Sequence, residues 1–398
     1  NLSMQKNSPK RNILVTVSGP DQPGITSKLM HLVTEHGASL RDMGQAVTHG
    51  LLSLSFLIEV TGEEPTVVKE LLFSCTQLNL TLTFQEIALR DMPTLGEKFI
   101  LSCVSTNNLP ASFVRDVADA VANAGINILR IDNMTPQNFT CLEITTTVPK
   151  GLSWKKVKEK LLEISTVHKV DVAFIKDNVF RRSKRLIVFD MDSTLIQTEV
   201  IDEMADVAGV GGEVRHITEE AMNGKMDFNE SLRQRVSKLK GLKESQLQTI
   251  LEGLPFTPGA VEFIQTVKSL GYKVALISGG FTFFAYALKE KLGLDYAFAN
   301  ELEIVDGKLT GEIEGTIVNA EQKAFLLKVI AQQEKISLEQ VVAIGDGAND
   351  LPMLAAAGLG MAFHAKDIVK QEAEQHMSHG PMTSILYFLG IPGPGQHN

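Results

Sequence analysis

The chain has 398 residues, of which 44% are hydrophobic and 21% charged, and its formal net charge is -9. This composition is typical of a soluble globular protein, and the negative charge provides no general attraction for nucleic acid or for an anionic membrane surface. The length is too great for one ordinary hydrophobic core and predicts two or three domains.

The cysteines and the hydropathy pattern indicate a cellular compartment. Cys75, Cys103 and Cys141 are far apart, odd in number and without the spacing of a metal site, so we expect buried free thiols in a reducing cytosol. No apolar run reaches the ~18 residues that cross a bilayer. Residues 1–11 lack the apolar core of a signal peptide. We therefore expect a cytoplasmic protein that binds neither membrane nor nucleic acid.

Residues 12–88 predict a small α/β unit. Apolar residues alternate in its strands and recur with helical spacing in its helices. A turn over 19–24 (GPDQPG) separates the first strand from the first helix. The expected strands are 13–18, 40–48, 51–60 and 78–88, and the expected helices are 25–35 and 67–75. The resulting order is βαββαβ.

Residues 97–176 repeat this plan at an offset of about 85 residues. The expected strands are 98–105, 126–133, 140–148 and 168–175, and the expected helices are 109–124 and 154–165. A repeated βαββαβ unit of this length predicts a pair of ferredoxin-like domains.

The pattern changes after the basic stretch 181–185 (RRSKR), which we expect to be a solvated linker. Three continuous apolar runs follow, each typical of a strand buried on both faces of a parallel sheet: 186–190, 273–277 and 341–344. Helical patterns such as 260–270 and 320–334 separate them. Alternating strands and helices predict a doubly wound, Rossmann-like α/β domain, in which ligands bind beyond the carboxyl ends of the strands.

The first of these strands ends in Asp190 and Asp192. Two carboxylates directly after a buried strand are costly unless a metal or a reaction requires them. We predict that Asp190 is a nucleophile that accepts a phosphoryl group. Asp192 would protonate the leaving oxygen and later deprotonate water, and neighbouring carboxylates would raise its pKa for the first of these tasks.

The other two strand ends add groups that suit a phosphate and a metal ion. Ser278 followed by Gly279 and Gly280 permits close backbone approach to an anion. Lys323, near the start of a predicted helix, is a candidate to neutralise phosphate charge. Asp346 and Asp350 in GDGAND supply hard oxygen atoms of the kind that Mg²⁺ prefers. We expect Asp346 to bind the metal and Asp350 either to support it or to hold Lys323.

DMDST (190–194), SGG (278–280), Lys323 and GDGAND (345–350) resemble the four ordered motifs of the haloacid-dehalogenase-like superfamily. An Asp two residues after the nucleophile resembles the phosphatases and phosphomutases of that superfamily, which favours phosphoryl transfer to water. The resemblance covers the carboxyl-terminal half of the chain.

Within the superfamily the chain resembles the phosphoserine phosphatases. Glu199 resembles the Glu that recognises the substrate ammonium in that family, and Arg235, in a helical cap, resembles the Arg that pairs with the substrate carboxylate. Met222 and Phe228 would close the pocket. The resemblance further implies that Asp190, the carbonyl of Asp192 and Asp346 hold Mg²⁺, that Ser278 and Lys323 bind phosphate, and that Gly279 and Asn349 line the site. It implies hydrolysis of O-phospho-L-serine through an aspartyl-phosphate, the last step of serine biosynthesis.

Residues 12–88 resemble an ACT domain, a family that senses small ligands such as amino acids. The resemblance implies a regulatory ligand, with serine as a candidate effector, near Asp21 and Gly24, and it implies a homodimer. The second copy has Ala111 where the first has Gly24, which leaves open whether that copy binds a ligand.

The sequence thus predicts three parts: a first ACT-like domain over 1–90, a second over 91–178, and a phosphatase domain over 179–398 with a helical cap at about 200–265. Two alternatives stay open. One is a related phosphatase or phosphotransferase acting on another small phosphorylated molecule, such as homoserine phosphate. The other is an amino-acid-sensing protein whose phosphatase half is inactive.

Overall fold

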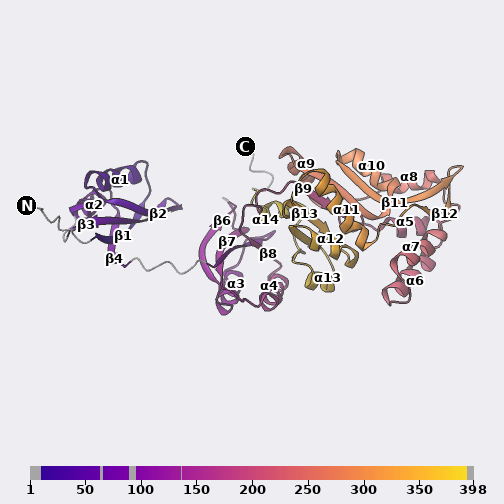
Figure 1. Ribbon diagram of the computed structural model, residues 1–398, viewed down its shortest axis with the longest axis horizontal. Coiled ribbons are helices and arrows are strands. Elements are labelled where there is room, and N and C mark those ends of the chain that lie inside the picture. Colours follow the sequence, from indigo (N-terminus) through magenta and orange to yellow (C-terminus); the bar gives the residue numbers. More distant parts are fainter. Residues whose placement is uncertain (1–9, 63–65, 89–95, 136, 392–398) are drawn as a thin grey trace, which may run out of the picture. The chain divides into compact units, whose positions relative to one another are not determined.

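The computed structural model describes residues 10–62, 66–88, 96–135 and 137–391 (Figure 1). The chain forms two compact units, Asn1–Leu95 and Gly96–Asn398, which are described separately. Among the described residues, no helix combines the length and apolar character needed to cross a membrane.

The first unit contains the first repeat (residues 10–87). Its elements are β1 (Lys10–Pro20), α1 (Ile25–Glu35), β2 (Ser39–Thr48), β3 (Leu51–Thr61), α2 (Thr66–Gln77) and β4 (Thr81–Ile87). The antiparallel sheet has the order β2-β3-β1-β4, in which β1 pairs with both β3 and β4 at the centre. Alternate residues of β1, including Val15 and Val17, are buried with Leu29 of α1 and Leu71 of α2. The expected βαββαβ order is confirmed, including the strand over 40–48.

The second repeat (residues 97–176) begins the second unit. Its elements are β5 (Glu97–Val104), α3 (Ala111–Asn123), β6 (Asn127–Asn133), β7 (Cys141–Val148), α4 (Trp154–His168) and β8 (Asp171–Lys176). The sheet order β6-β7-β5-β8 reproduces that of the first repeat. The three cysteines, Cys75, Cys103 and Cys141, are buried free thiols, as the sequence predicted.

The large domain (residues 186–391) is built on a seven-stranded sheet of order β12-β11-β10-β9-β13-β14-β15. The strands are β9 (Leu186–Phe189), β10 (Lys273–Phe281), β11 (Tyr296–Val305), β12 (Lys308–Glu314), β13 (Val341–Gly345), β14 (Leu359–Phe363) and β15 (Gln375–Met377). All neighbouring strands are parallel except the β11–β12 pair, which is antiparallel. The doubly wound parallel sheet is therefore confirmed, with an antiparallel hairpin at one edge.

The central strands are buried on both faces because their residues enter two separate cores. Ile187 and Phe189 of β9 pack in one apolar cluster, whereas Leu186 and Val188 pack in another on the opposite face. The helices that surround this sheet are α9 (Ala260–Ser269), α10 (Thr282–Leu292), α11 (Ala320–Gln333), α12 (Leu351–Ala356), α13 (Asp367–Glu372) and α14 (Ile385–Phe388). Continuous apolar runs in the sequence are explained by this two-sided burial.

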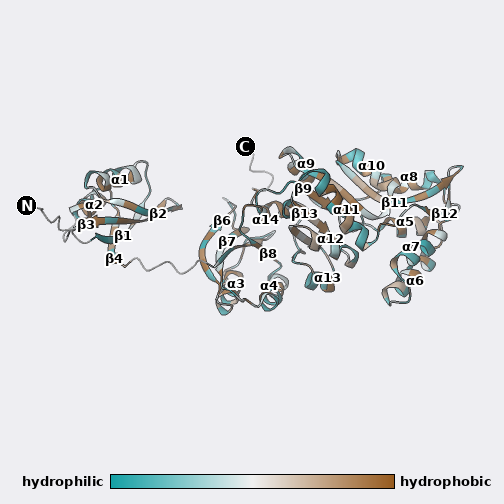
Figure 2. Ribbon diagram, viewed as in Figure 1, coloured by the Kyte–Doolittle hydropathy of each residue, from teal (hydrophilic) through white to brown (hydrophobic). Residues whose placement is uncertain are grey.

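Four helices form an insertion between β9 and α9: α5 (Val200–Val207), α6 (Gly211–Met222), α7 (Phe228–Ser237) and α8 (Glu244–Glu252). Hydrophilic residues cover much of α6 and α7 (Figure 2). The buried minority, including Leu232 and Val236 of α7, joins the main core of the large domain. This insertion lies in the range where the sequence predicted a helical cap.

The prediction that 181–185 is a solvated linker was wrong for two of its residues, since Arg182 and Arg185 are exposed but Arg181 and Lys184 are buried. Arg181 is 2% exposed, and its guanidinium pairs with the buried carboxylate of Glu143 at 2.9 Å. Lys184 is also buried, and its Nζ donates to the carbonyl of Glu339 at 2.5 Å. Because these cations are held by β7 and by the large domain, the stretch packs between the second repeat and the large domain.

Further hydrogen bonds join the second repeat to the large domain. The buried carboxylate of Asp171 accepts hydrogen bonds from the backbone N–H groups of Ser378, His379 and Gly380, the shortest at 2.6 Å. The Gln375 side chain bonds both backbone groups of Phe174, at 2.9 and 2.7 Å. These contacts explain why residues 96–398 form one compact unit.

Candidate active site

The three strands that the sequence singled out, β9, β10 and β13, lie side by side at the centre of the sheet. Because they are parallel, their carboxyl ends meet at one edge. Asp190 follows β9, Ser278 lies near the end of β10, and Asp346 follows β13. Asp190 and Asp346, which are 346 − 190 = 156 residues apart in the chain, are thereby brought to a single site.

A buried lysine bridges two of the carboxylates. Nζ of Lys323 lies 2.8 Å from Oδ1 of Asp190 and 2.7 Å from Oδ1 of Asp350. The Lys323 and Asp350 side chains are fully buried, and that of Asp190 is 8% exposed. Helix α11 delivers the lysine from its first turn, where the side chain of Asn319 caps the helix by accepting from the N–H of Gln322 at 3.0 Å. A buried charge of this kind requires such partners.

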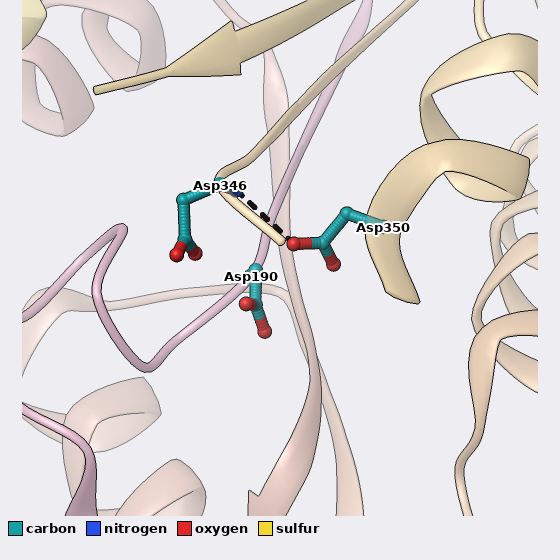
Figure 3. A group of neighbouring side chains, drawn as sticks. All are labelled: Asp190, Asp346 and Asp350. Atoms are coloured by element: carbon teal, nitrogen blue, oxygen red, sulfur yellow. Dashed lines mark hydrogen bonds between the residues drawn. The ribbon is translucent and has the colours of Figure 1, made fainter. Parts of the chain in front are cut away.

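Asp350 also fixes the loop that carries Asp346. Its Oδ2 accepts from the backbone N–H groups of Asp346 and Gly347, at 3.1 and 3.0 Å. A Cβ atom at Gly345 would lie 2.5 Å from Cγ of Asp350, so the loop requires glycine there. Figure 3 shows the carboxylates of Asp190, Asp346 and Asp350 facing a common space.

Asp192 and Asp346 are each held by one hydrogen bond. The N–H of Val200, at the start of α5, donates to Oδ1 of Asp192 at 3.0 Å. Oγ1 of Thr194 donates to Oδ1 of Asp346 at 2.9 Å. Thr194 was not singled out from the sequence, because its place four residues after Asp190 gives no signal of a contact with the loop after β13.

Burial raises the pKa values of the acidic groups. Burial, reinforced by Glu199, raises the pKa of Asp192 to about 8. Burial and the charge of Asp350 raise the pKa of Asp346 to about 7 and that of Asp190 well above its ordinary value. Burial alone would lower the pKa of Lys323, but Asp190 and Asp350 outweigh it and raise the pKa. A protonated Asp192 beside an ionised lysine is therefore expected at neutral pH.

The charged groups of the cap lie near one another. Oγ of Ser193 donates to Oε1 of Glu199 at 2.7 Å, and Ser193 adopts a left-handed backbone with φ of 58°. Burial raises the pKa of Glu199 and lowers that of Arg235, and each group favours the charged form of the other. Asp202 on α5, which the sequence analysis missed, also interacts with Arg235. The cap thus presents an exposed carboxylate and a half-buried guanidinium to one region.

Phe228, Gly279 and Asn349 converge, but Met222 does not join them. A Cβ atom at Gly279 would lie 3.3 Å from Cζ of Phe228 and 3.9 Å from Nδ2 of Asn349. Ser278 is fully buried, and its Oγ accepts from the N–H of Gly280 at 2.8 Å. Met222 ends α6 and is 72% exposed, so it covers nothing in this conformation.

The acidic cluster fits a divalent cation. Asp190, Asp346 and Asp350 each offer a carboxylate oxygen within 4.8 Å of the others. Asp350 is already engaged by Lys323 and by two N–H groups, whereas the Asp346 carboxylate accepts a single hydrogen bond, from Thr194, among the described residues. Hard carboxylate oxygens at such spacing suit a small cation with remaining water ligands.

The first repeat contains an open cavity of about 510 Å³ along α1, lined in part by Gly24, Ser27 and His31. Gly24 precedes α1 with φ of 93°, and a Cβ atom there would meet nothing within 4 Å. Asp21, which the sequence analysis paired with Gly24, does not line the cavity. In the second repeat Pro110 caps α3, which Ala111 begins.

Comparison with known proteins gives a family to each part of the chain. Residues 187–355 match the haloacid dehalogenase-like hydrolase family, and residues 11–85 and 103–175 each match an ACT domain family. Two ACT domains therefore precede a hydrolase domain, as the sequence analysis expected.

Similar proteins cover nearly the whole chain. The phosphoserine phosphatase SerB2 of Mycobacterium tuberculosis is 37% identical over 96% of this chain and 94% of its own. A phosphoserine phosphatase of Streptomyces coelicolor is 38% identical over 98% of this chain and 95% of its own. A crystal structure of a probable phosphoserine phosphatase from Vibrio cholerae matches with a TM-score of 0.60 and 39% identity, covering 75% of this chain and 89% of that one.

Proposed function

Because the chain belongs to the phosphoserine phosphatase family, we propose that it hydrolyses O-phospho-L-serine to L-serine and phosphate, the step that ends serine biosynthesis. The observation that carries the proposal is the convergence of Asp190, Asp192 and Lys323 at one sheet edge, beneath a cap that holds Glu199 and Arg235. The nucleophile, the acid and the lysine suit a phosphate group, the Glu199 carboxylate suits an ammonium group, and the Arg235 guanidinium suits a carboxylate. Phosphate, ammonium and carboxylate are the three polar groups of a phosphorylated amino acid.

In the first step, a carboxylate oxygen of Asp190 attacks phosphorus, and the bond between phosphorus and the serine oxygen breaks. Asp192, whose pKa is raised to about 8, donates its proton to that oxygen, so L-serine leaves as the neutral alcohol. Lys323 stays ionised between Asp190 and Asp350 and offsets the negative charge that develops on the phosphoryl oxygens.

In the second step, water attacks phosphorus and the bond to Asp190 breaks, releasing phosphate. Asp192, now ionised, removes the proton from that water, which restores both groups. The hydrogen bond from Val200 keeps Asp192 in place through both steps. The N–H groups of the turn after Asp190 and the Ser278–Gly279 segment are placed to bind phosphate oxygens.

We assign the metal as Mg²⁺, held by Asp190, Asp346 and the carbonyl of Asp192. When bound, it supplies Lewis-acid stabilisation of phosphoryl oxygens. Thr194 holds Oδ1 of Asp346 at 2.9 Å, which orients this carboxylate, and Asp350 fixes the backbone of the same loop.

The test is phosphate release from O-phospho-L-serine with Mg²⁺ and with EDTA. Asp190→Asn should abolish turnover while the protein stays folded, and Arg235→Ala should raise KM for phosphoserine far more than for an aryl phosphate. Arg233→Ala is the matched control, because Arg233 is exposed on the same helix. Equal losses on both substrates would reject the carboxylate-binding role of Arg235, and preferred turnover of homoserine phosphate would reject the substrate assignment.

We also propose that L-serine binds the cavity beside Gly24 and inhibits the enzyme. Support comes from the open cavity at α1 and from the glycine whose missing side chain leaves backbone accessible. Inhibition by L-serine that Ser27→Leu abolishes, with unchanged basal turnover, is the expected result, because Ser27 lines the same cavity from the exposed face of α1. Inhibition that is purely competitive and unaffected by Ser27→Leu would place the serine at the active site instead.

A homodimer is the proposed assembly. All ten residues of the edge strand β2 are exposed, and they include Leu40, Met43 and Val47. An edge strand with unpaired backbone groups and apolar side chains is a natural surface for pairing with a second copy. Light scattering of the full chain should give twice the monomer mass, and a monomer at micromolar concentration would reject this assembly.

A further inference from the structure

A second cavity, of about 430 Å³, lies where the second repeat meets the large domain. Strands β5 and β8 and helix α4 form most of its wall, and Glu374, Gln375 and His376 of the large domain complete it. It is separate from the sheet edge that carries Asp190 and from the cavity beside Gly24, since it shares no lining residue with either.

Three aromatic rings form one side of this cavity. The ring centroids of Phe99 and Trp154 are 4.7 Å apart, those of Phe99 and Phe174 are 5.2 Å apart, and those of Trp154 and Phe174 are 5.5 Å apart. Trp154 is nevertheless 43% exposed, although tryptophan is the residue with the most apolar surface to bury. A tilted, partly uncovered aromatic cluster of this kind offers its faces and edges to another flat ring.

The charges around the rings leave a positive excess. Lys176 and Glu97 pair with each other at 2.6 Å. Glu374 faces Lys158, whose Nζ donates to the carbonyl of Ala373. Lys155 remains, with its nearest ion-pair partner, Glu159, at 4.0 Å and outside the cavity lining.

The large-domain wall adds hydrogen-bonding capacity without charge. Burial lowers the pKa of His376 to about 4, so its ring is neutral at pH 7. His376 is 5% exposed, and its Nδ1 has no hydrogen-bond partner among the described residues. A buried polar atom without a partner is uncommon in a native fold and can be satisfied by a water molecule, an ion or a ligand.

We propose that this cavity binds a small aromatic carboxylate, with its ring on the Phe99–Trp154–Phe174 cluster and its carboxylate toward Lys155. Contact with the three rings buries apolar surface of the ligand, and the positive charge of Lys155 favours an anionic ligand over a cationic one. A ligand here contacts both the second repeat and the large domain, two strands away in the sheet from the strand that leads to Asp346. A bound ligand therefore stabilises the packing of the second repeat against the large domain.

The single tryptophan of the chain, Trp154, provides the assay. The full chain is titrated with 3-phenylpropionate, and tryptophan fluorescence and heat are recorded. Propionate, which lacks the ring, and phenethylamine, which carries the opposite charge, are the comparison probes. We expect a saturable fluorescence change with matching heat for 3-phenylpropionate alone, together with a higher Tm.

Variants test each part of the proposed site. Phe99→Leu should weaken binding roughly tenfold. Lys155→Ala should weaken it about threefold to fivefold, whereas Lys160→Ala, on the same helix but outside the cavity, should not change it. Arg235→Ala must also leave binding unchanged, which distinguishes this cavity from the active site.

Two results would overturn the proposal: no saturable signal up to on the order of 10 mM ligand, or binding of phenethylamine as tight as that of 3-phenylpropionate. The assay needs no turnover, so its outcome is independent of the phosphatase activity.

Discussion

Replacing Lys323 by methionine tests the electrostatics of the active site. Methionine keeps most of the side-chain length but removes the charge that lies 2.8 Å from Asp190 and 2.7 Å from Asp350. The lysine and Asp350 side chains are fully buried, so solvent cannot take over its role. Breaking a buried ion pair by removing one partner costs about 3–5 kcal/mol when the remaining charge stays ionised.

The loss of unfolding free energy caused by Lys323→Met should depend on pH. Burial and Asp350 already raise the pKa of Asp190 well above its ordinary value, and loss of Lys323 raises it further. A carboxyl group whose pKa is raised by folding contributes stability that is present below its unfolded pKa, near 4, and is lost as pH rises through the folded pKa. Without metal, we therefore expect Lys323→Met to lower the free energy of unfolding by about 3–5 kcal/mol at pH 8.5, and by about 1–2 kcal/mol less than that at pH 5.

The assay is urea unfolding in EDTA at both pH values, combined with phosphate release in Mg²⁺. Turnover should fall by about 10²–10³-fold or more, because the lysine stabilises charge that develops on the phosphoryl group. Lys328→Met, on the exposed face of the same helix, is the control and should change neither quantity. Equal destabilisation at pH 5 and pH 8.5, or turnover within threefold of the unaltered protein, would refute the reasoning.

Three further predictions concern the packing of the second repeat on the large domain. Asp171→Ala removes the acceptor of three backbone N–H groups, one buried and two partly buried, and should cost about 3 kcal/mol in urea unfolding. Asp171→Asn, which keeps one acceptor oxygen, should cost less, and equal costs would contradict this account. Burial lowers the pKa of His376 to about 4, so its contribution to the free energy of unfolding should be fully present above pH ~6.5 and should fall by about 3 kcal/mol as the pH drops toward 4. His376→Gln should flatten that part of the profile of unfolding free energy against pH, and an unchanged slope would reject the role of His376. Arg181→Ala leaves Glu143 buried without its closest cation and should cost about 3 kcal/mol by thermal unfolding, whereas the double variant Arg181→Met/Glu143→Met should recover most of that loss.

The elements were predictable because local patterns and tertiary packing agree. Helix 25–35 was predicted with the same bounds as α1, since its apolar residues Ile25, Leu29 and Val33 recur with helical spacing and are all buried. The strand over 40–48 has a weaker sequence pattern, because all residues of β2 are exposed and apolar and polar residues therefore need not alternate along it. Its pairing with β3 creates the strand, and this pairing is a tertiary contact.

The candidate site was predictable to the level of the sheet edge. Polar residues after buried strands converge when those strands are parallel neighbours, so Asp190, Ser278 and Asp346 could be grouped from sequence order alone. Lys323 was a candidate because it lies near the start of a predicted helix in the same half of the chain, and the resemblance to a family motif supported it; taken alone, its sequence context is that of a surface lysine. Its complete burial follows from packing of α11 against the sheet, which places it between Asp190 and Asp350.

What the sequence determined by itself is the repeated βαββαβ plan, the doubly wound sheet and the positions of the acidic groups along it, because alternation, turns and strand ends are local properties. Only the tertiary structure decided which charges are buried. Arg181 lies in a basic stretch typical of a linker, yet Glu143, 38 residues away, neutralises it inside the protein. Likewise, the contact of Thr194 with Asp346 spans 152 residues. The free energy of a buried charge depends on its partners, and these partners are assembled only by the fold.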